Sequence, residues 1–172
     1  MRKYFVYFMI YSFLGFVLER IINIIFLGYY YDNSVLVGPY QPLYGLGILL
    51  AIIFYDLYLK DMQRKLPKYL SLIIIAIITT GLSEFLHGEG YELFKGTQLW
   101  DYRQTFICTY PYVCVLPTSL FGVLSALAII LFHPLIDKLV SNMPKLFFKW
   151  TFWILLVTLA IDGIYTFFFT LL

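Results

Sequence analysis

Groups that could do chemistry gather in one stretch, between Gly81 and Arg103. It holds one of the two histidines, His87. It also holds four of the ten acidic residues, namely Glu84, Glu89, Glu92 and Asp101. An ionised group at mid-membrane costs roughly 3 kcal/mol, so such groups face a bundle interior or a wet cavity and usually pair. Because the stretch begins inside an apolar run and ends in polar sequence, it predicts a polar site near one membrane face.

The spacing of Glu84 and His87 matches the Glu-x-x-His ligands of di-iron helix bundles. Such centres need two of these motifs. The other histidine, His133, is predicted at the inner end of a different span. We therefore expect no metal site and no cofactor.

Two neighbouring groups have both a structural and a functional interpretation. Glu92 precedes Lys95 on what is expected to be a helix end, where charges usually form a solvated face. An interfacial indole, an acid and a base follow in Trp100-Asp101-Tyr102-Arg103. These four residues could cap a site, or form a turn held by a contact between the acid and the base.

Charged residues also occur in the first span. Glu19 and Arg20 are neighbours, 100° apart on a helix, so we expect Arg20 to reach Glu84 or Asp162 on another span. Two hypotheses stay open for this set: a buried cluster of ion pairs that fixes helix register, or a polar pocket open to the outside. For Glu84 we favour the pocket, and for Asp162 the structural role.

A rigid, irregular segment precedes the second span. It contains Gly38, Pro39, Pro42, Tyr44 and Gly45. Prolines fix φ, glycines permit unusual φ, and irregular backbone at membrane depth is tolerated where it lines a cavity or is buried. We expect these residues to form the wall or gate of the pocket.

Several other functions lack a sequence signal. The chain has no glycine-rich phosphate loop, so we do not expect it to hydrolyse ATP itself. It has no long basic run, so nucleic acid is not expected as a partner. Cys108 and Cys114 could form a disulfide outside the cell, but Cys114 could also begin a span as a small apolar residue. We favour free thiols.

Composition predicts what positions these residues. The 172 residues are 62% hydrophobic and 13% charged, whereas soluble domains are about half apolar and a quarter charged. A spanning helix needs roughly 20 apolar residues. Five segments qualify: about Tyr4–Leu27, Pro42–Tyr58, Tyr69–His87, Val113–Phe132 and Phe147–Leu172. We expect one integral membrane domain over residues 1–172, an all-α bundle of five helices, with room for a sixth, re-entrant element near Gly38 or Glu89.

The distribution of lysine and arginine predicts orientation. If the N-terminus lies inside, the inner segments hold nine of the twelve basic residues and the outer segments hold Lys95 and Arg103. Cytoplasmic loops carry such an excess. We therefore predict a multi-pass protein of the cell membrane with its N-terminus inside, so that the polar stretch lies near the outer face.

Three signatures in this chain resemble a family of small bacterial membrane proteins known as putative ABC-transporter permeases, with which a vertebrate transmembrane family is grouped. They are Tyr11-Ser12-Phe13-Leu14-Gly15-Phe16-x-x-Glu19, Gly38-Pro39-Tyr40-x-Pro42-x-Tyr44-Gly45, and Glu84, Gly88 and Glu92 followed by Trp100-Asp101-Tyr102. Cys114 and Phe121-Gly122 resemble a weaker fourth block. Departures are Phe16 in place of a usual Trp, and Arg103 in place of a small polar residue. The resemblance implies that Glu19, Glu84, Glu92 and Asp101 are the family's polar set.

Three functional hypotheses follow. The first is a transport component, a small permease-like subunit whose outer site is lined by Glu19, Arg20 and Glu84. It would work in the lipid bilayer as a homo-oligomer or with a partner membrane or ATPase subunit. The second, which we favour less, is a membrane-embedded enzyme acting on a lipid head group or a lipid-linked substrate. Glu84 or Glu92 would then act as general base, and Arg20 or Arg103 would hold a phosphate. The third is a structural or regulatory membrane protein.

Overall fold

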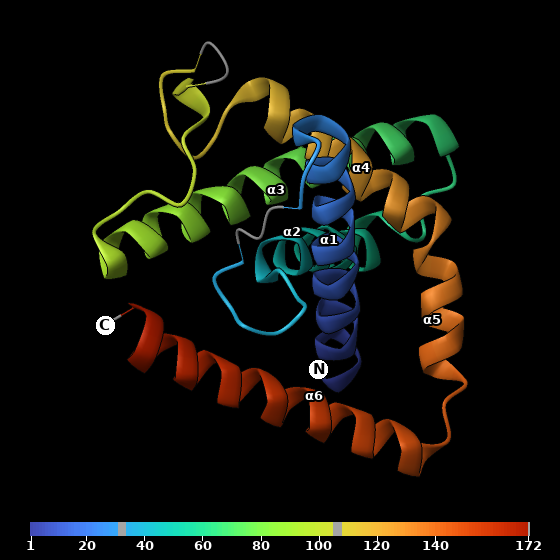
Figure 1. Ribbon diagram of the computed structural model, residues 1–172. Coiled ribbons are helices and arrows are strands. Elements are labelled where there is room, and N and C mark those ends of the chain that lie inside the picture. The colour runs from blue at the N-terminus through green and yellow to red at the C-terminus, as the bar shows by residue number, and fades with distance from the viewer. Residues whose placement is uncertain (31–33, 105–107, 172) are drawn as a thin grey trace. The chain divides into compact units, whose positions relative to one another are not determined.

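Six α-helices make up most of the residues that the structure describes. The computed structural model describes residues 1–30, 34–104 and 108–171 (Figure 1). The helices are α1 (Arg2–Leu27), α2 (Pro42–Phe54), α3 (Lys65–Lys95), α4 (Val115–Leu131), α5 (His133–Ser141) and α6 (Lys145–Thr166). π-Helical turns extend α2 and α6 over Tyr55–Leu59 and Phe167–Leu171, and a 3₁₀ turn covers Tyr102–Gln104.

The predicted membrane architecture is confirmed. Four helices are long and apolar enough to cross a bilayer alone: α1, α2 with its π-turn, α3 and α6. The helices α4 and α5 pass the same test together, bent by 49° at their junction, which makes up to five spans. The predicted fifth span reached Leu172, which lies outside the described residues.

The sequence left room for a sixth, re-entrant element near Gly38 or Glu89. Gly38 lies in non-helical backbone before α2, and Glu89 lies inside α3. A further helix that the sequence did not predict is α5, nine residues between α4 and α6. It is too short to span a membrane alone, since about 20 residues are needed.

Contacts divide the chain into two compact units. Unit 1 comprises residues 1–45 and 137–172, and unit 2 comprises residues 46–136. In unit 1, α1 and α6 meet where the rings of Phe5 and Phe152 lie 5.4 Å apart, edge to face. The guanidinium of Arg2 also lies over the Phe152 ring, 5.5 Å from its centre.

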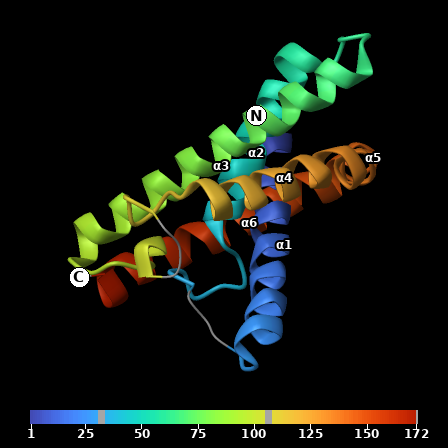
Figure 2. The same ribbon diagram turned by 90° about the horizontal axis from the view of Figure 1, so that it is seen from above.

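In unit 2, α3 and α4 run side by side, as Figures 1 and 2 both show. Small residues permit this closeness. A Cβ added to Gly122 of α4 would lie 2.5 Å from the backbone Cα of Ile77 on α3. A Cβ added to Gly81 of α3 would lie 3.2 Å from the methyl carbon of Thr118. Such close backbone approach is typical of membrane helix pairs.

The helix α3 continues past its apolar stretch to Lys95. It ends at Gly96, whose φ of 70° is left-handed and whose N–H bonds to the Glu92 carbonyl. Glycine favours this conformation at helix C-termini because it has no Cβ. The extra turns beyond His87 carry Glu89 and Glu92, so they hold these two carboxylates in helical register with Glu84.

Candidate functional site

Glu84 is buried in α3, with 2% of its surface exposed, and neutral hydroxyl groups hold its carboxylate. The hydroxyl of Tyr102 donates to one carboxylate oxygen at 2.7 Å. The hydroxyl of Thr118, on α4, donates to the other. Thr118 also accepts a bond from the backbone N–H of Cys114 at 3.3 Å. The carboxylate therefore joins α3, α4 and the segment between them.

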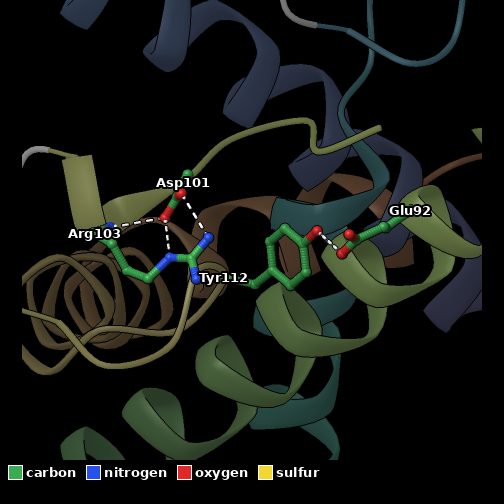
Figure 3. Close-up of polar contacts among 4 residues, drawn as sticks. All are labelled: Glu92, Asp101, Arg103 and Tyr112. Atoms are coloured by element: carbon green, nitrogen blue, oxygen red, sulfur yellow. Dashed lines mark hydrogen bonds and ion pairs between the residues drawn. The ribbon is translucent and has the colours of Figure 1, made fainter. Parts of the chain in front are cut away.

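Two further tyrosines bind the next carboxylates along α3. Tyr112 donates to Glu92, as Figure 3 shows, and Tyr110 donates to Glu89. Burial and the bond to Glu92 raise the pKa of Tyr112 to about 12. The bond to Glu89 and partial burial likewise raise the pKa of Tyr110 to about 12. Both phenols are therefore protonated donors at neutral pH.

Aromatic rings surround these bonds. The ring of Trp100 is stacked on His87 with centres 6.0 Å apart, and it meets Tyr112 edge to face at 5.6 Å. Tyr112 in turn meets Tyr110 edge to face at 5.9 Å. The indole N–H of Trp100 is buried and has no hydrogen-bond partner among the described residues.

Asp101 and Arg103 form the turn-holding contact that the sequence offered as one alternative. The guanidinium donates from Nε at 2.9 Å and from Nη2 at 2.8 Å, and the Arg103 backbone N–H also bonds to the carboxylate (Figure 3). The bonds from Arg103 hold the pKa of Asp101 below its usual value. The Arg103 side chain is 44% exposed, so the pair lies at the surface of unit 2.

The expectation of free thiols is wrong. Cys108 and Cys114 form a disulfide, with Cα atoms 5.6 Å apart. Cys114 is the N-cap of α4 and not a residue inside the span, and there it lies beside Cys108. The disulfide loop contains Tyr110 and Tyr112, so it restrains the segment that binds Glu89 and Glu92.

In unit 1, Asp162 of α6 holds the segment before α2. Its carboxylate accepts bonds from the backbone N–H groups of Val37 at 3.0 Å and Gly38 at 2.7 Å. It also accepts from the hydroxyls of Tyr40 at 2.6 Å and Thr166 at 3.2 Å. Four donors satisfy this carboxylate within the chain, an arrangement that suits the structural role expected for it.

The partners expected for Arg20 differ from those found. Its guanidinium donates to Ser34 at 2.5 Å and lies 3.6 Å from the Glu19 carboxylate. It also lies over the Phe16 ring, 4.1 Å from its centre. The 100° between neighbouring helix positions does not prevent this contact, because the arginine side chain is long and flexible. Glu19 further accepts a bond from Gln41 at 2.5 Å.

The expected wall segment packs against α1. Pro42 is the first residue of α2, as its fixed φ suits. A Cβ added to Gly45 would lie 2.0 Å from the Ser12 hydroxyl, so only glycine fits there. One added to Gly15 would lie 2.4 Å from Tyr44. Its role as a wall or gate stays a prediction.

The candidate residues thus fall into two groups, one in each unit. Unit 2 brings together Glu84, His87, Glu92, Trp100, Asp101, Tyr102 and Arg103. Unit 1 holds Glu19, Arg20, Gly38, Pro39, Pro42, Tyr44 and Gly45. Sequence reasoning missed the partners of the α3 carboxylates: Thr118, Tyr110 and Tyr112. No local pattern marks such long-range partners, although two tyrosines between two cysteines were visible in the sequence.

Long apolar helices that carry buried polar side chains define a multi-pass helical membrane protein. More particularly, the chain belongs to the family described as putative ABC-transporter type IV, whose model matches residues 6–167. No curated protein and no solved structure matches the chain. The family resemblance expected from the sequence signatures is therefore confirmed, and the family's description is that of an ABC-transporter component.

Proposed function

We propose that this protein is a small permease-like subunit of a membrane transporter, with its polar site centred on Glu84. The observation that carries the proposal is the contact between Glu84 and Tyr102. Glu84 is 2% exposed inside a long apolar helix, yet its partner comes from the segment that follows that helix. A carboxylate placed in this way joins the interior of the span to its end.

The disulfide supports an outer location for this end of the site. Disulfides form and persist in oxidising surroundings outside the cytoplasm. The Cys108–Cys114 bond lies in the connection between α3 and α4. The excess of basic residues in the opposite loops predicts the same side. On this proposal, Tyr102, Tyr110 and Tyr112 lie at the outer end of unit 2.

Access from two sides tests the proposal. Because both native cysteines are in a disulfide, a single introduced cysteine supplies the reactive thiol. Ser83→Cys replaces a buried hydroxyl beside Glu84, whereas Leu82→Cys, 46% exposed on the helix surface, is the control. In oriented membranes, we expect charged, membrane-impermeant thiol reagents to label Ser83→Cys from each side and Leu82→Cys from neither.

Other labelling patterns would contradict the proposal. Labelling of Ser83→Cys from the outside alone would favour an enzyme working at the outer leaflet. Labelling from neither side, with Glu84→Gln lowering only the melting temperature, would favour a structural cluster. One observation supports the structural cluster, since residues of the same chain bond to both carboxylate oxygens of Glu84.

A partner subunit belongs to the proposal as well. The chain shows no phosphate-binding glycine loop, so transport driven by ATP would need a separate ATPase. We expect native mass spectrometry of gently extracted protein to find an ATPase or a second membrane subunit. Recovery of a homo-oligomer with full transport activity after reconstitution would remove the need for such a partner.

A further inference from the structure

The charge of Glu84 is not compensated within the described part of the chain. Its hydrogen-bond partners are the hydroxyls of Tyr102 and Thr118, which are neutral. None of the ion pairs among the described residues includes it. A carboxylate buried in an apolar span normally pairs with a cation, because the isolated charge is costly there.

The helices of unit 2 offer no basic side chain at this depth. Along α3, the nearest are Lys95 and Lys68, about 16 and 24 Å away at 1.5 Å per residue. The residues of α2 and α4 include no lysine or arginine. Arg103 is bonded to Asp101, and the His87 ring is stacked on Trp100.

A second buried group near Glu84 has an unused oxygen. Thr80 is 8% exposed, and its hydroxyl has no hydrogen-bond partner among the described residues. It lies one turn before Glu84, and side chains at i and i+4 share one face of a helix. The neighbouring hydroxyl of Ser83 is different, since it donates to the Thr79 carbonyl at 2.9 Å.

The face of α2 opposite Thr80 carries no side chain at the point of contact. A Cβ added to Gly47 would lie 3.6 Å from the Thr80 hydroxyl oxygen and 3.5 Å from that of Ser83. Thr80 is therefore enclosed by α3 and α2, and Glu84 is enclosed by α3 and α4. The two groups thus lie one turn apart on the same face of α3, and both are buried.

We propose that Glu84, Thr80 and Thr118 bind a small monovalent metal cation of the sodium class. Hard cations bind oxygen ligands, and one carboxylate balances one positive charge. Such a cation would compensate Glu84 and use the lone pairs of the Thr80 hydroxyl. The inference deepens the proposed transport function, since the cation would be a coupling ion or the transported ion.

The test uses the purified full chain in lipid nanodiscs and sodium chloride as the probe. Choline chloride replaces sodium chloride at constant ionic strength, because the methyl groups on the choline nitrogen prevent oxygen lone pairs from coordinating it as they coordinate a bare metal cation. We expect the melting temperature to rise with sodium concentration, and above the dissociation constant to go on rising with its logarithm, as it does for any ligand that binds the folded state alone. Equilibrium binding of radioactive sodium should saturate at one ion per chain.

Two variants locate the site. Thr80→Val removes the unpartnered hydroxyl at nearly constant volume, so we expect normal folding in choline and sodium binding weakened at least tenfold. Glu84→Gln should abolish binding. Thr158→Val is the matched control, because its hydroxyl is exposed and bonds only to the Ile154 carbonyl in α6. It should bind sodium like the wild type.

Three results would overturn the cation site. In the first, the melting temperature does not depend on sodium. In the second, Thr80→Val responds to sodium as strongly as the wild type. In the third, acid raises the melting temperature of the wild type without sodium, and Glu84→Gln removes this effect. The last result would show that a proton neutralises Glu84. The two proposals fail separately: sodium binding with one-sided labelling at Ser83→Cys would refute transport, and two-sided labelling without sodium binding would refute the cation site.

Discussion

Gly122 gives a sharp test of the packing between α3 and α4. In Gly122→Ala, the new Cβ would lie 2.5 Å from the Cα and 2.8 Å from the backbone nitrogen of Ile77. Ordinary contact begins at about 3.4 Å, so the helices must separate by roughly 1 Å, and neither backbone atom can rotate away. Overpacking of this kind costs about 1–3 kcal/mol. Alanine recovers up to about 1 kcal/mol through helix propensity, and with that full gain the net loss is up to about 2 kcal/mol.

Gly90→Ala is the matched control. Gly90 lies inside α3, and an added Cβ would meet nothing within 4 Å. Here only the propensity gain of up to about 1 kcal/mol acts, so this variant should be slightly more stable than the wild type. The two substitutions are chemically identical and share the propensity gain, so Gly122→Ala should be less stable than Gly90→Ala by the overpacking cost of about 1–3 kcal/mol.

The assay is unfolding in mixed micelles with increasing sodium dodecyl sulfate, followed by tryptophan fluorescence. Equal stability of Gly122→Ala and Gly90→Ala would refute the close approach of α4 to the Ile77 backbone. A stabilised Gly122→Ala would have the same meaning. Destabilisation of both variants would instead show that Gly90 packs against something outside this chain.

Three further predictions concern the polar contacts. Reducing the Cys108–Cys114 disulfide should lower the free energy of unfolding by about 2 kcal/mol, the value for a short closed loop. Added reductant should lower the melting temperature of the wild type and leave that of the variant with serine at both positions unchanged. Asp162→Asn turns an amide N–H₂ toward N–H and O–H donors that need an acceptor, so the free energy of unfolding should fall by about 1–3 kcal/mol. Proteolysis of residues 34–41 should become faster. The pKa of Tyr112 is raised from 10.0 to about 12, so its stabilising contribution is complete below pH 10 and is lost as pH rises through 12. Phenolate absorbance should show this titration, and Tyr112→Phe should remove both the signal and the part of the alkaline destabilisation that it carries.

The sequence predicted the apolar spans well because hydrophobicity over about 20 residues is a local property. It placed the end of the third apolar span near His87, where the apolar run stops, and a helix end around Glu92 and Lys95, and α3 does end at Lys95. Lys95 followed by Gly96 is a helix C-terminus signature. The helix α5 was missed because it is short and amphipathic.

The candidate site was only partly predictable, for a physical reason. A carboxylate inside an apolar span is unusual because burying its charge costs free energy, so Glu84 and Asp162 could be identified from residue type and position alone. The identity of their partners depends on tertiary contacts over long sequence separations, such as Thr118 with Glu84 and Tyr40 with Asp162. Periodicity along one helix carries no information about such contacts.

The composition of the two units has a consequence for biosynthesis. Unit 2 is one continuous piece of chain, residues 46–136, whereas unit 1 is made from both ends. Units tend to fold as they emerge during synthesis. Unit 2 can therefore complete its helix pair while the ribosome is still making α6. The segment around Gly38 gains its Asp162 acceptor only at the end, so a ribosome stalled before α6 would leave that segment open to proteases.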